Sequence, residues 1–336
     1  MLSTRTLART PAQVYDLRLL WIREIETRIR MNPMYNPPDA PWSFSMMEFN
    51  FLAMMPLGKL RRLLKWTRIE NRPHPVFESM AIILGKFFEP TEEYWIWWPT
   101  NTVATLDDFM DGGDYCIVTG DPTTGPCALV PGNLTVRQPE EGMCFLWKHL
   151  IPVLEDLFSG KEMPLHVISD MYRDTYLAWN RLPLNEQLCH WFWQARCGFK
   201  FLGRNNVAAD AVPAHLNNGD GKPKTIVTLE FHWLPGREGV RPDDRVDLST
   251  QRRGKDQSLY NLLQKPRLPD SHIQSPLDQA SRPIRSGQTV PIAVDLEDAA
   301  KFICAIKLHW ALSKIAAVSG YGYDDEGEMS DDDPYC

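Results

Sequence analysis

The sequence predicts an α+β fold in which helices at both ends of the chain pack around a core that contains a short sheet. Apolar residues recur at helical spacing over residues 11–31, 145–158 and 297–319, whereas they alternate with polar residues over residues 225–233, as in a strand. With 336 residues, 43% of them apolar and 24% charged, the chain is long enough to bury a large core as one domain or two.

We expect residues 1–105 to form a helical region that is rich in aromatic and Met side chains. Thr10, as an N-cap before a proline, predicts the start of a helix over residues 11–31. Residues 58–66 are basic and amphipathic, which indicates a surface helix, with attachment to a membrane surface as the alternative. A further apolar helix is expected over residues 76–88.

Tryptophan is the most unusual component of the chain, with 12 residues. Large aromatic side chains fill cores, and they also line pockets for bulky apolar ligands. The core interpretation is the simpler one for each residue, but residues 94–99 are aromatic enough to indicate a pocket wall as well. The predicted substrate-pocket residues are Trp95, Trp97, Trp98, Trp191 and Trp193.

Asp107, Asp108 and Asp111 form an Asp-Asp-x-x-Asp pattern. On a helix this spacing places two carboxylates on one face, where they could hold Mg²⁺ and a diphosphate as class I terpene synthases do. Gly112 and Gly113 would end such a helix at once, and no second metal motif follows. A solvated acidic turn is therefore favoured over a metal-dependent diphosphate lyase.

Residues 106–235 are expected to form the central unit of the fold. A strand is predicted at residues 115–120, with residues 127–131 as its antiparallel partner. An amphipathic helix over residues 145–158 and a second helical segment within residues 184–201 follow these strands.

Residues 116–120, 127–131 and 180–190 resemble the motifs of the fungal HNH-type (ββα-metal) nuclease family. Those motifs are Cys-x-x-Thr-Gly, a His followed by two apolar residues and Pro, and an Asn followed by a second His. The resemblance covers at most the last two-thirds of the chain. It implies that the helical N-terminal region packs on an HNH-like core whose active site is degenerate. The residues at the family's first His, Asn and second His are Ala128, Asn180 and Cys189.

In an active member of this family the first His would be the general base, and the second would help to hold a divalent ion. Alanine can do neither, and a Cys thiolate suits zinc or copper(I) better than Mg²⁺. The resemblance thus implies a scaffold that has lost nuclease chemistry, and we expect no metal and no cofactor. Rescue of hydrolysis by His149, His166 or His190 stays open as the alternative.

Charge and cysteine content limit the partners that we expect. A net charge of −7 offers no global attraction to nucleic acid. Seven cysteines without a Cys-x-x-Cys pair indicate reduced thiols and no structural zinc site. The first residues lack the apolar core of a secretory signal, and no apolar run approaches the roughly 20 residues of a membrane span, so a soluble cytoplasmic protein is expected.

The remainder of the chain divides into three parts. Residues 236–285 are rich in proline and in charges that largely cancel, which predicts a mobile loop. Residues 286–320 are expected to add a strand and a long helix to the HNH-like core, and residues 321–336 to form a disordered acidic tail.

These features lead to three hypotheses about function. The first is a cofactor-independent cyclase that performs a Diels–Alder-type closure on a hydrophobic terpenoid or polyketide intermediate of fungal secondary metabolism, because such a reaction needs an apolar cavity and one polarising donor. The candidate donors are Asn180, His190 and Lys148. The alternatives are a pseudo-nuclease that binds without catalysis, and a metal-dependent nuclease or diphosphate lyase.

Overall fold

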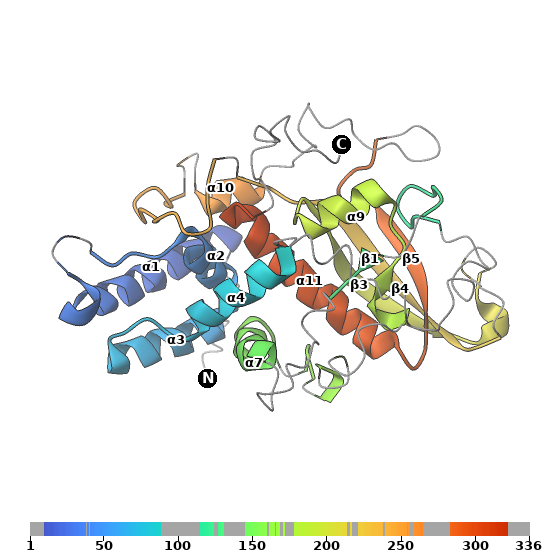
Figure 1. Ribbon diagram of the computed structural model, residues 1–336, viewed down its shortest axis with the longest axis horizontal. Coiled ribbons are helices and arrows are strands. Elements are labelled where there is room, and N and C mark those ends of the chain that lie inside the picture. The colour runs from blue at the N-terminus through green and yellow to red at the C-terminus, as the bar shows by residue number, and fades with distance from the viewer. Residues whose placement is uncertain are drawn as a thin grey trace, which may run out of the picture.

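The computed structural model combines helices and sheet, which confirms the α+β class. In Figure 1 the N-terminal helices lie at one end of the molecule, a three-stranded sheet lies at the other, and the last helix crosses between them. The structure describes residues 10–37, 39, 41–88, 115–123, 127–130, 145–159, 161–164, 166–168, 171, 178–213, 216, 221–237, 239–253, 255, 258–264 and 283–321.

Helix α1 (Pro11–Arg30) begins where the sequence predicts. The Thr10 side chain accepts a hydrogen bond from the Gln13 backbone N–H, and the Gln13 side chain accepts one from the Thr10 N–H, which completes a capping box. The apolar face of the helix packs against α2 (Met46–Met54) and α3 (Leu57–Glu70). Its buried apolar residues are Tyr15, Leu19, Ile22, Ile25 and Ile29.

The apolar segment that contains α2 and α3 is divided at Met55 and Pro56. Ser45 and Glu48 form a second capping box at the start of α2. Pro56 is the N-cap of α3, because a proline is tolerated at a helix start and not in the interior. Helix α3 buries Leu60, Leu63 and Leu64, as expected for an amphipathic helix on the protein surface.

Two more helices cover the side of this region. Helix α4 (Val76–Phe88) packs against α7 (Phe145–Leu157), and both lie near the residues that the sequence predicts. Pro152 lies inside α7. The two short 3-10 turns of the described chain outside the motif region are η1 (Pro33–Tyr35) and η4 (Ala209–Ala211).

The sheet consists of β3 (Cys197–Val207), β4 (Lys224–Trp233) and β5 (Thr289–Asp295), in the order β3-β4-β5. Both pairs of neighbours are antiparallel, and an irregularity between Phe201 and Gly203 shifts the register of the first pair. The burial of β4 alternates along the strand, as the sequence pattern over residues 225–233 predicts.

Helix α11 (Ala299–Ser319) is the shared core of the two ends (Figure 1). It packs against α2 on one side and against β3 on the other. The buried Asn50 of α2 donates hydrogen bonds to the Val318 carbonyl (2.9 Å) and to the Ser319 hydroxyl (3.0 Å). By length and composition α11 is apolar enough to cross a membrane, but 78% of its apolar window is buried in the fold, which is typical of a core helix.

Gly320 ends α11 in the left-handed conformation, with a φ of 90°. A Cβ atom at this position would lie 1.8 Å from the Val240 carbonyl oxygen. The residue must be glycine for both reasons, because the conformation disfavours a side chain and the space is already filled.

Residues 115–131 do not form the predicted hairpin. Tyr115 bridges to Pro122 within a tight turn, and Cys116 N–H donates to the Asp121 carbonyl at 2.7 Å. The strand β1 (Cys127–Ala128) pairs instead with β2 (Arg181–Leu182), more than fifty residues further along the chain. This partner could not be found from local alternation, because strand pairing at this distance is decided by tertiary packing.

The described part of residues 236–285 is packed against the N-terminal helices, and the mobility predicted for this segment stays a prediction. Val246 N–H donates to the Phe44 carbonyl (2.9 Å), and the Tyr15 hydroxyl donates to the Gln251 carbonyl (2.8 Å). Val246, Leu248 and Leu259 are buried, the last at the start of helix α10 (Leu259–Gln264). A few buried apolar residues and backbone hydrogen bonds order a segment whose composition is otherwise polar.

Candidate functional site

The motif residues lie in a strand–strand–helix element at the sheet end of the molecule. β1 and β2 form an antiparallel pair, with Cys127 opposite Leu182 and Ala128 opposite Arg181. Helix α9 (Glu186–Trp193) follows β2, and the Asn185 side chain caps it by accepting from the Leu188 N–H at 2.9 Å. A helix follows in the place that the resemblance predicts, but β2, and not residues 115–120, is the strand that pairs with β1. The assignment of this element as an HNH core stays a prediction.

Asn180 holds the start of this element together. It lies in the 3-10 turn η3 (Ala178–Asn180) and is 1% exposed. Its side-chain oxygen accepts from the Val130 N–H (2.8 Å), and its Nδ2 donates to the Val130 carbonyl (2.8 Å). Its own carbonyl accepts from the Leu129 N–H at 3.0 Å. The Asn180 side-chain amide therefore bonds to the Val130 backbone as a neighbouring strand would, and it joins β1 to β2. This geometry does not favour Asn180 as a hydrogen-bond donor to a substrate.

The side chain next to Cys189 belongs to Cys127. The two thiols share a hydrogen bond, and Cys127 is buried while Cys189 is half-buried. Because side chains alternate along a strand, Ala128 faces away from the side of β1 that meets α9. Cys127 is the neighbour of Cys189 that sequence reasoning missed, and the assignment of Ala128, Asn180 and Cys189 as degenerate HNH positions stays a prediction.

Four thiols, Cys116, Cys127, Cys189 and Cys197, lie near one another at this junction. Burial raises the pKa of Cys127 well above its usual range, and the neighbouring Cys189 thiol adds to the effect. Burial likewise raises the pKa of Cys197, with smaller contributions from Cys189 and Cys116. Both groups are neutral thiols at physiological pH, which makes them poor nucleophiles and poor metal ligands.

The residues of this element do not fit the divalent ion of an active ββα-metal nuclease. Such an ion needs deprotonated or imidazole ligands that converge on one point, and Mg²⁺ prefers oxygen ligands. Here the thiols are neutral, and the amide of Asn180 is bound to the Val130 backbone. Within the described residues, no three His, Cys, Asp or Glu side chains are arranged to hold a metal ion. The aspartates at 107, 108 and 111 lie outside that set.

The predicted replacement bases are found in separate places. His190 is exposed on α9, away from the buried face of the helix, as its position one residue after Cys189 predicts. His149 is buried on α7, and its Nδ1 lies 3.0 Å from the Ser79 hydroxyl of α4. His166 is exposed. The side chain of Lys148 lies outside the described residues.

The two tryptophans of α9 are core residues. Trp191 is 5% exposed and packs edge-on against Trp233, with ring centroids 5.5 Å apart. Trp193 is half-buried, and its ring meets the edge of the His309 ring at 6.4 Å. Both side chains pack against the core, as the core interpretation expects, and their role in a substrate pocket stays a prediction. Trp95, Trp97 and Trp98 lie outside the described residues.

The surroundings of the His309 ring show that the core beneath α9 excludes water. The ring stacks on Phe192 with centroids 3.6 Å apart and an interplanar angle of 5°, and its Nδ1 lies 2.8 Å from the Ser313 hydroxyl. Burial lowers the pKa of His309 to about 3. The residue is neutral at physiological pH and packs as a core side chain, which is the interpretation that its position on an apolar helix favours.

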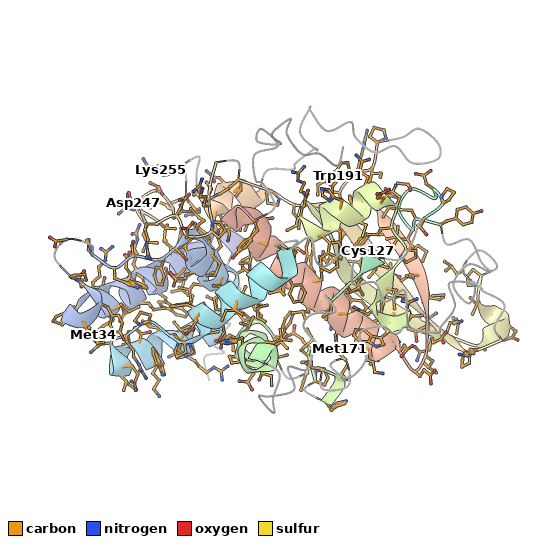
Figure 2. All side chains as sticks on the ribbon, in the orientation of Figure 1. Met34, Cys127, Met171, Trp191, Asp247 and Lys255 are labelled. Carbon is orange, nitrogen blue, oxygen red and sulfur yellow. The ribbon has the colours of Figure 1, made fainter. Side chains whose placement is uncertain are left out.

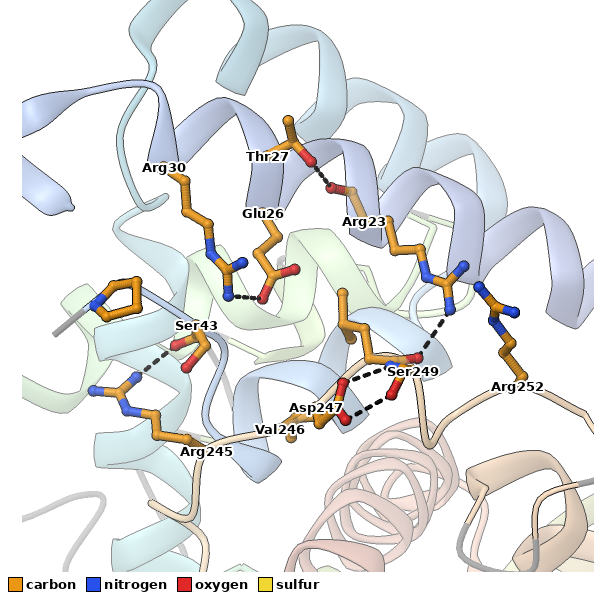
Figure 3. A pocket seen from close by; sticks show the side chains of 12 residues that line it. Arg23, Glu26, Thr27, Arg30, Ser43, Arg245, Val246, Asp247, Ser249 and Arg252 are labelled. Atoms are coloured by element: carbon orange, nitrogen blue, oxygen red, sulfur yellow. Dashed lines mark hydrogen bonds and ion pairs between the residues drawn. The ribbon is translucent and has the colours of Figure 1, made fainter. Parts of the chain in front are cut away.

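A polar pocket of about 610 Å³ lies at the other end of the molecule, between α1 and residues 245–252 (Figure 3). We call it the arginine pocket. One wall is the face of α1 that carries Arg23, Glu26, Thr27 and Arg30; the other runs from Pro41 and Ser43 to residues 245–252. Figure 2 shows Asp247, which lines this pocket, far from Cys127 and Trp191. Its charged lining residues are Arg23, Arg30, Arg245, Arg252, Glu26 and Asp247.

Hydrogen bonds to backbone carbonyls hold three of the arginines in place. Arg23 donates to the Leu248 carbonyl (3.0 Å), and Arg245 donates to the Ser43 carbonyl (2.6 Å). Arg30 donates through Nε to the Trp42 carbonyl (2.6 Å) and through Nη2 to Glu26 (2.9 Å). For Arg252, no side-chain hydrogen bond or ion pair is found among the described residues.

The two carboxylates of the pocket are already bound. Burial raises the pKa of Glu26, and the adjacent Arg30 partly offsets that shift. Hydrogen bonds from the Ser249 side chain (2.6 Å) and backbone N–H (2.8 Å) lower the pKa of Asp247. Both carboxylates are therefore hydrogen-bonded to other groups of the protein. Together they neutralise only part of the positive charge of the four arginines.

Comparison with protein-family models, with curated proteins and with solved structures found no match to this chain. The resemblance to HNH-type nucleases is therefore carried by the quoted motif residues and by the strand–strand–helix order alone.

One wall of the arginine pocket has a signal in the sequence. Arg23, Glu26, Thr27 and Arg30 lie at i, i+3, i+4 and i+7, so they share one helical face. A charged helical face usually indicates a solvated surface, and Arg245 and Arg252 belong to a segment whose charges largely cancel. The two groups are more than two hundred residues apart, and only the packing of residues 239–253 against α1 brings them together.

Proposed function

We propose that this chain is a pseudo-nuclease that acts by binding and does not hydrolyse phosphodiesters. The observation that carries the proposal is the double hydrogen bond between the Asn180 amide and the Val130 backbone, since it assigns a structural role to the one residue that matches the family's catalytic set. The hydrogen-bonded thiols of Cys127 and Cys189 support it further, because they fill the space between β1 and α9.

The chemistry of phosphodiester cleavage supports the same proposal. The reaction needs a base for the attacking water and a cation for the developing charge, and loss of the base alone typically slows it about 10²–10⁴-fold. Ala128 cannot accept a proton, and the thiols near α9 are neutral. The Nδ1 of His149 lies within hydrogen-bond distance of the Ser79 hydroxyl on α4, and this contact does not favour His149 as a replacement base.

Incubation of the purified chain with supercoiled plasmid tests the proposal. We expect no nicking above that of a buffer control in Mg²⁺, Mn²⁺, Ni²⁺ or Zn²⁺. The double substitution Ala128→His with Cys189→His is expected to remain inactive, because residue 128 does not face α9. Metal-dependent nicking by the unaltered chain that is lost in His149→Ala, His166→Ala or His190→Ala would overturn the proposal.

The cyclase hypothesis stays a prediction. It requires an apolar cavity, and the arginine pocket is lined by charged residues instead. The aromatic residues at 95, 97 and 98 that would form the cavity wall lie outside the described residues. Conversion of a hydrophobic intermediate by the pure protein in the presence of EDTA would favour the cyclase over the binding protein.

A further inference from the structure

We propose that the arginine pocket binds a small phosphorylated molecule that carries at least two negative charges. The site lies on α1 and on residues 245–252, remote from α9, so the proposal holds whether or not the motif element has lost hydrolysis. Three properties of the pocket support this ligand: its charge, the hydrogen-bond donors of its arginines and its volume.

The charge of the pocket is opposite to that of the chain. Four guanidinium groups and two carboxylates line it, which leaves a formal excess of two positive charges. The whole chain has a net charge of −7, so an anion would be attracted to this place and repelled by most of the remaining surface. A local positive site in an acidic protein favours a small anion over a long polyanion such as nucleic acid.

The arginines retain donors that the protein does not use. A guanidinium has five N–H donors, and the hydrogen bonds to the Leu248 and Ser43 carbonyls occupy one donor of Arg23 and one of Arg245. Arg252 is exposed and has no side-chain partner among the described residues. The bonds that are made hold the guanidiniums of Arg23 and Arg245 in place, so little side-chain entropy is lost when an anion binds.

The arrangement of the donors favours two anionic groups. In Figure 3 the guanidiniums of Arg23 and Arg252 point toward one end of the pocket, and those of Arg30 and Arg245 lie toward the other, with Glu26 and Asp247 between them. Arginine binds phosphate oxygens through paired N–H donors, and this geometry is stronger and more specific than a lysine contact.

The size of the pocket agrees with a small-molecule ligand. Its volume of about 610 Å³ lies within the range of roughly 300–1,000 Å³ that is usual for ligand sites. A nucleoside diphosphate or a comparable phosphorylated metabolite would fit, with the phosphates at one pair of arginines. Inorganic diphosphate is the smallest probe of this chemistry, and ADP is a probe of the full volume.

The test is isothermal titration calorimetry of the full chain with inorganic diphosphate and with ADP at low ionic strength. We expect saturable binding at one site. Arg252→Gln removes a charge without breaking a described hydrogen bond, and it should weaken binding about tenfold, as expected for loss of one charge-assisted contact. Arg253→Gln is the matched control, since it removes the same charge from the next residue, which faces Asp16 and does not line the pocket.

Three results would overturn the proposal. The first is the absence of saturable binding of both probes to the unaltered chain at millimolar concentration. The second is an equal loss of affinity in Arg252→Gln and Arg253→Gln, which would indicate general charge attraction. The third is binding to vesicles that contain a phosphorylated inositol lipid, lost in Arg252→Gln, without binding of either soluble probe. Thermal unfolding without ligand should be the same for both variants.

Discussion

The strand–strand–helix element and the arginine pocket differ in what their polar side chains contact. At the first, Asn180 is bound to the Val130 backbone and the Cys127 thiol is buried and neutral. At the second, three arginines are held by backbone carbonyls, while several of their donors and the whole side chain of Arg252 have no partner among the described residues. The comparison teaches that a motif identifies residues by type, whereas function depends on whether their polar atoms are still free to bind.

The largest effect is expected from Gly320→Ala, which places a side chain against the backbone of Val240 at the end of α11. The new Cβ would overlap the Val240 carbonyl in a left-handed conformation, so the free energy of unfolding should fall by about 3 kcal/mol or more. Urea unfolding measures the change. Gly58→Ala in α3 is the control, since no atom lies within 4 Å of its Cβ position and stability should be unchanged or slightly raised.

Asn180→Ala is the direct test of the structural role of the amide. The substitution leaves the Val130 N–H and carbonyl unpaired in the core, and we expect the free energy of unfolding to fall by about 2–4 kcal/mol. His190→Ala on the exposed side of α9 should change it by less than about 0.5 kcal/mol. Equal stability of Asn180→Ala and the unaltered chain would mean that the amide is not structural, and the contrast between the two regions would be lost.

The pH dependence of stability tests how well the core beneath α9 excludes water. The pKa of His309 is lowered from its ordinary 6.5 to about 3 in the folded chain, so below pH 6.5 the unfolded state binds a proton that the folded state does not. Stability is therefore full above pH 6.5 and declines as the pH falls toward 3, by roughly 2 kcal/mol between pH 7.5 and pH 5. Urea unfolding of His309→Gln at both pH values should show a clearly smaller decline.

The smallest effect is expected at the ion pair between Arg253 and Asp16, which lies just outside the arginine pocket. The pair is 2.7 Å long, and both side chains are exposed. Because solvent screens such pairs, Arg253→Gln should leave the free energy of unfolding nearly unchanged. A larger loss would show that this residue supports the pocket wall and would weaken its use as a binding control.

The helices could be predicted well because their signals are local. Thr10 and the periodic apolar residues located α1 to within one residue, and the same periodicity located α4, α7 and α11. Alternation of apolar and polar residues located β4 in the same way.

The partner of β1 could not be predicted, because a two-residue strand has no alternation to read and its partner lies beyond fifty intervening residues. The order of residues 239–253 was missed for a similar reason, since a polar composition does not reveal backbone hydrogen bonds to a helix formed early in the chain.

At the candidate sites, too, the local features are predictable from the sequence and the long-range contacts are not. The motif locates Cys189 and Asn180, but it does not reveal that Cys127 lies beside Cys189, because the facing side of a strand depends on its pairing. The arginine pocket consists of two groups that each look like an ordinary solvated surface, and no local pattern joins them.

The position of α11 has a consequence for biosynthesis. Among the described elements this helix leaves the ribosome last, yet it is the wall on which both α2 and β3 close. The faces of α2 and β3 that pack on α11 cannot be buried before α11 has been made, so the nascent chain must remain partly open until then. We expect this interval to be the time at which the chain depends most on chaperones, since exposed apolar surface in incomplete chains promotes aggregation.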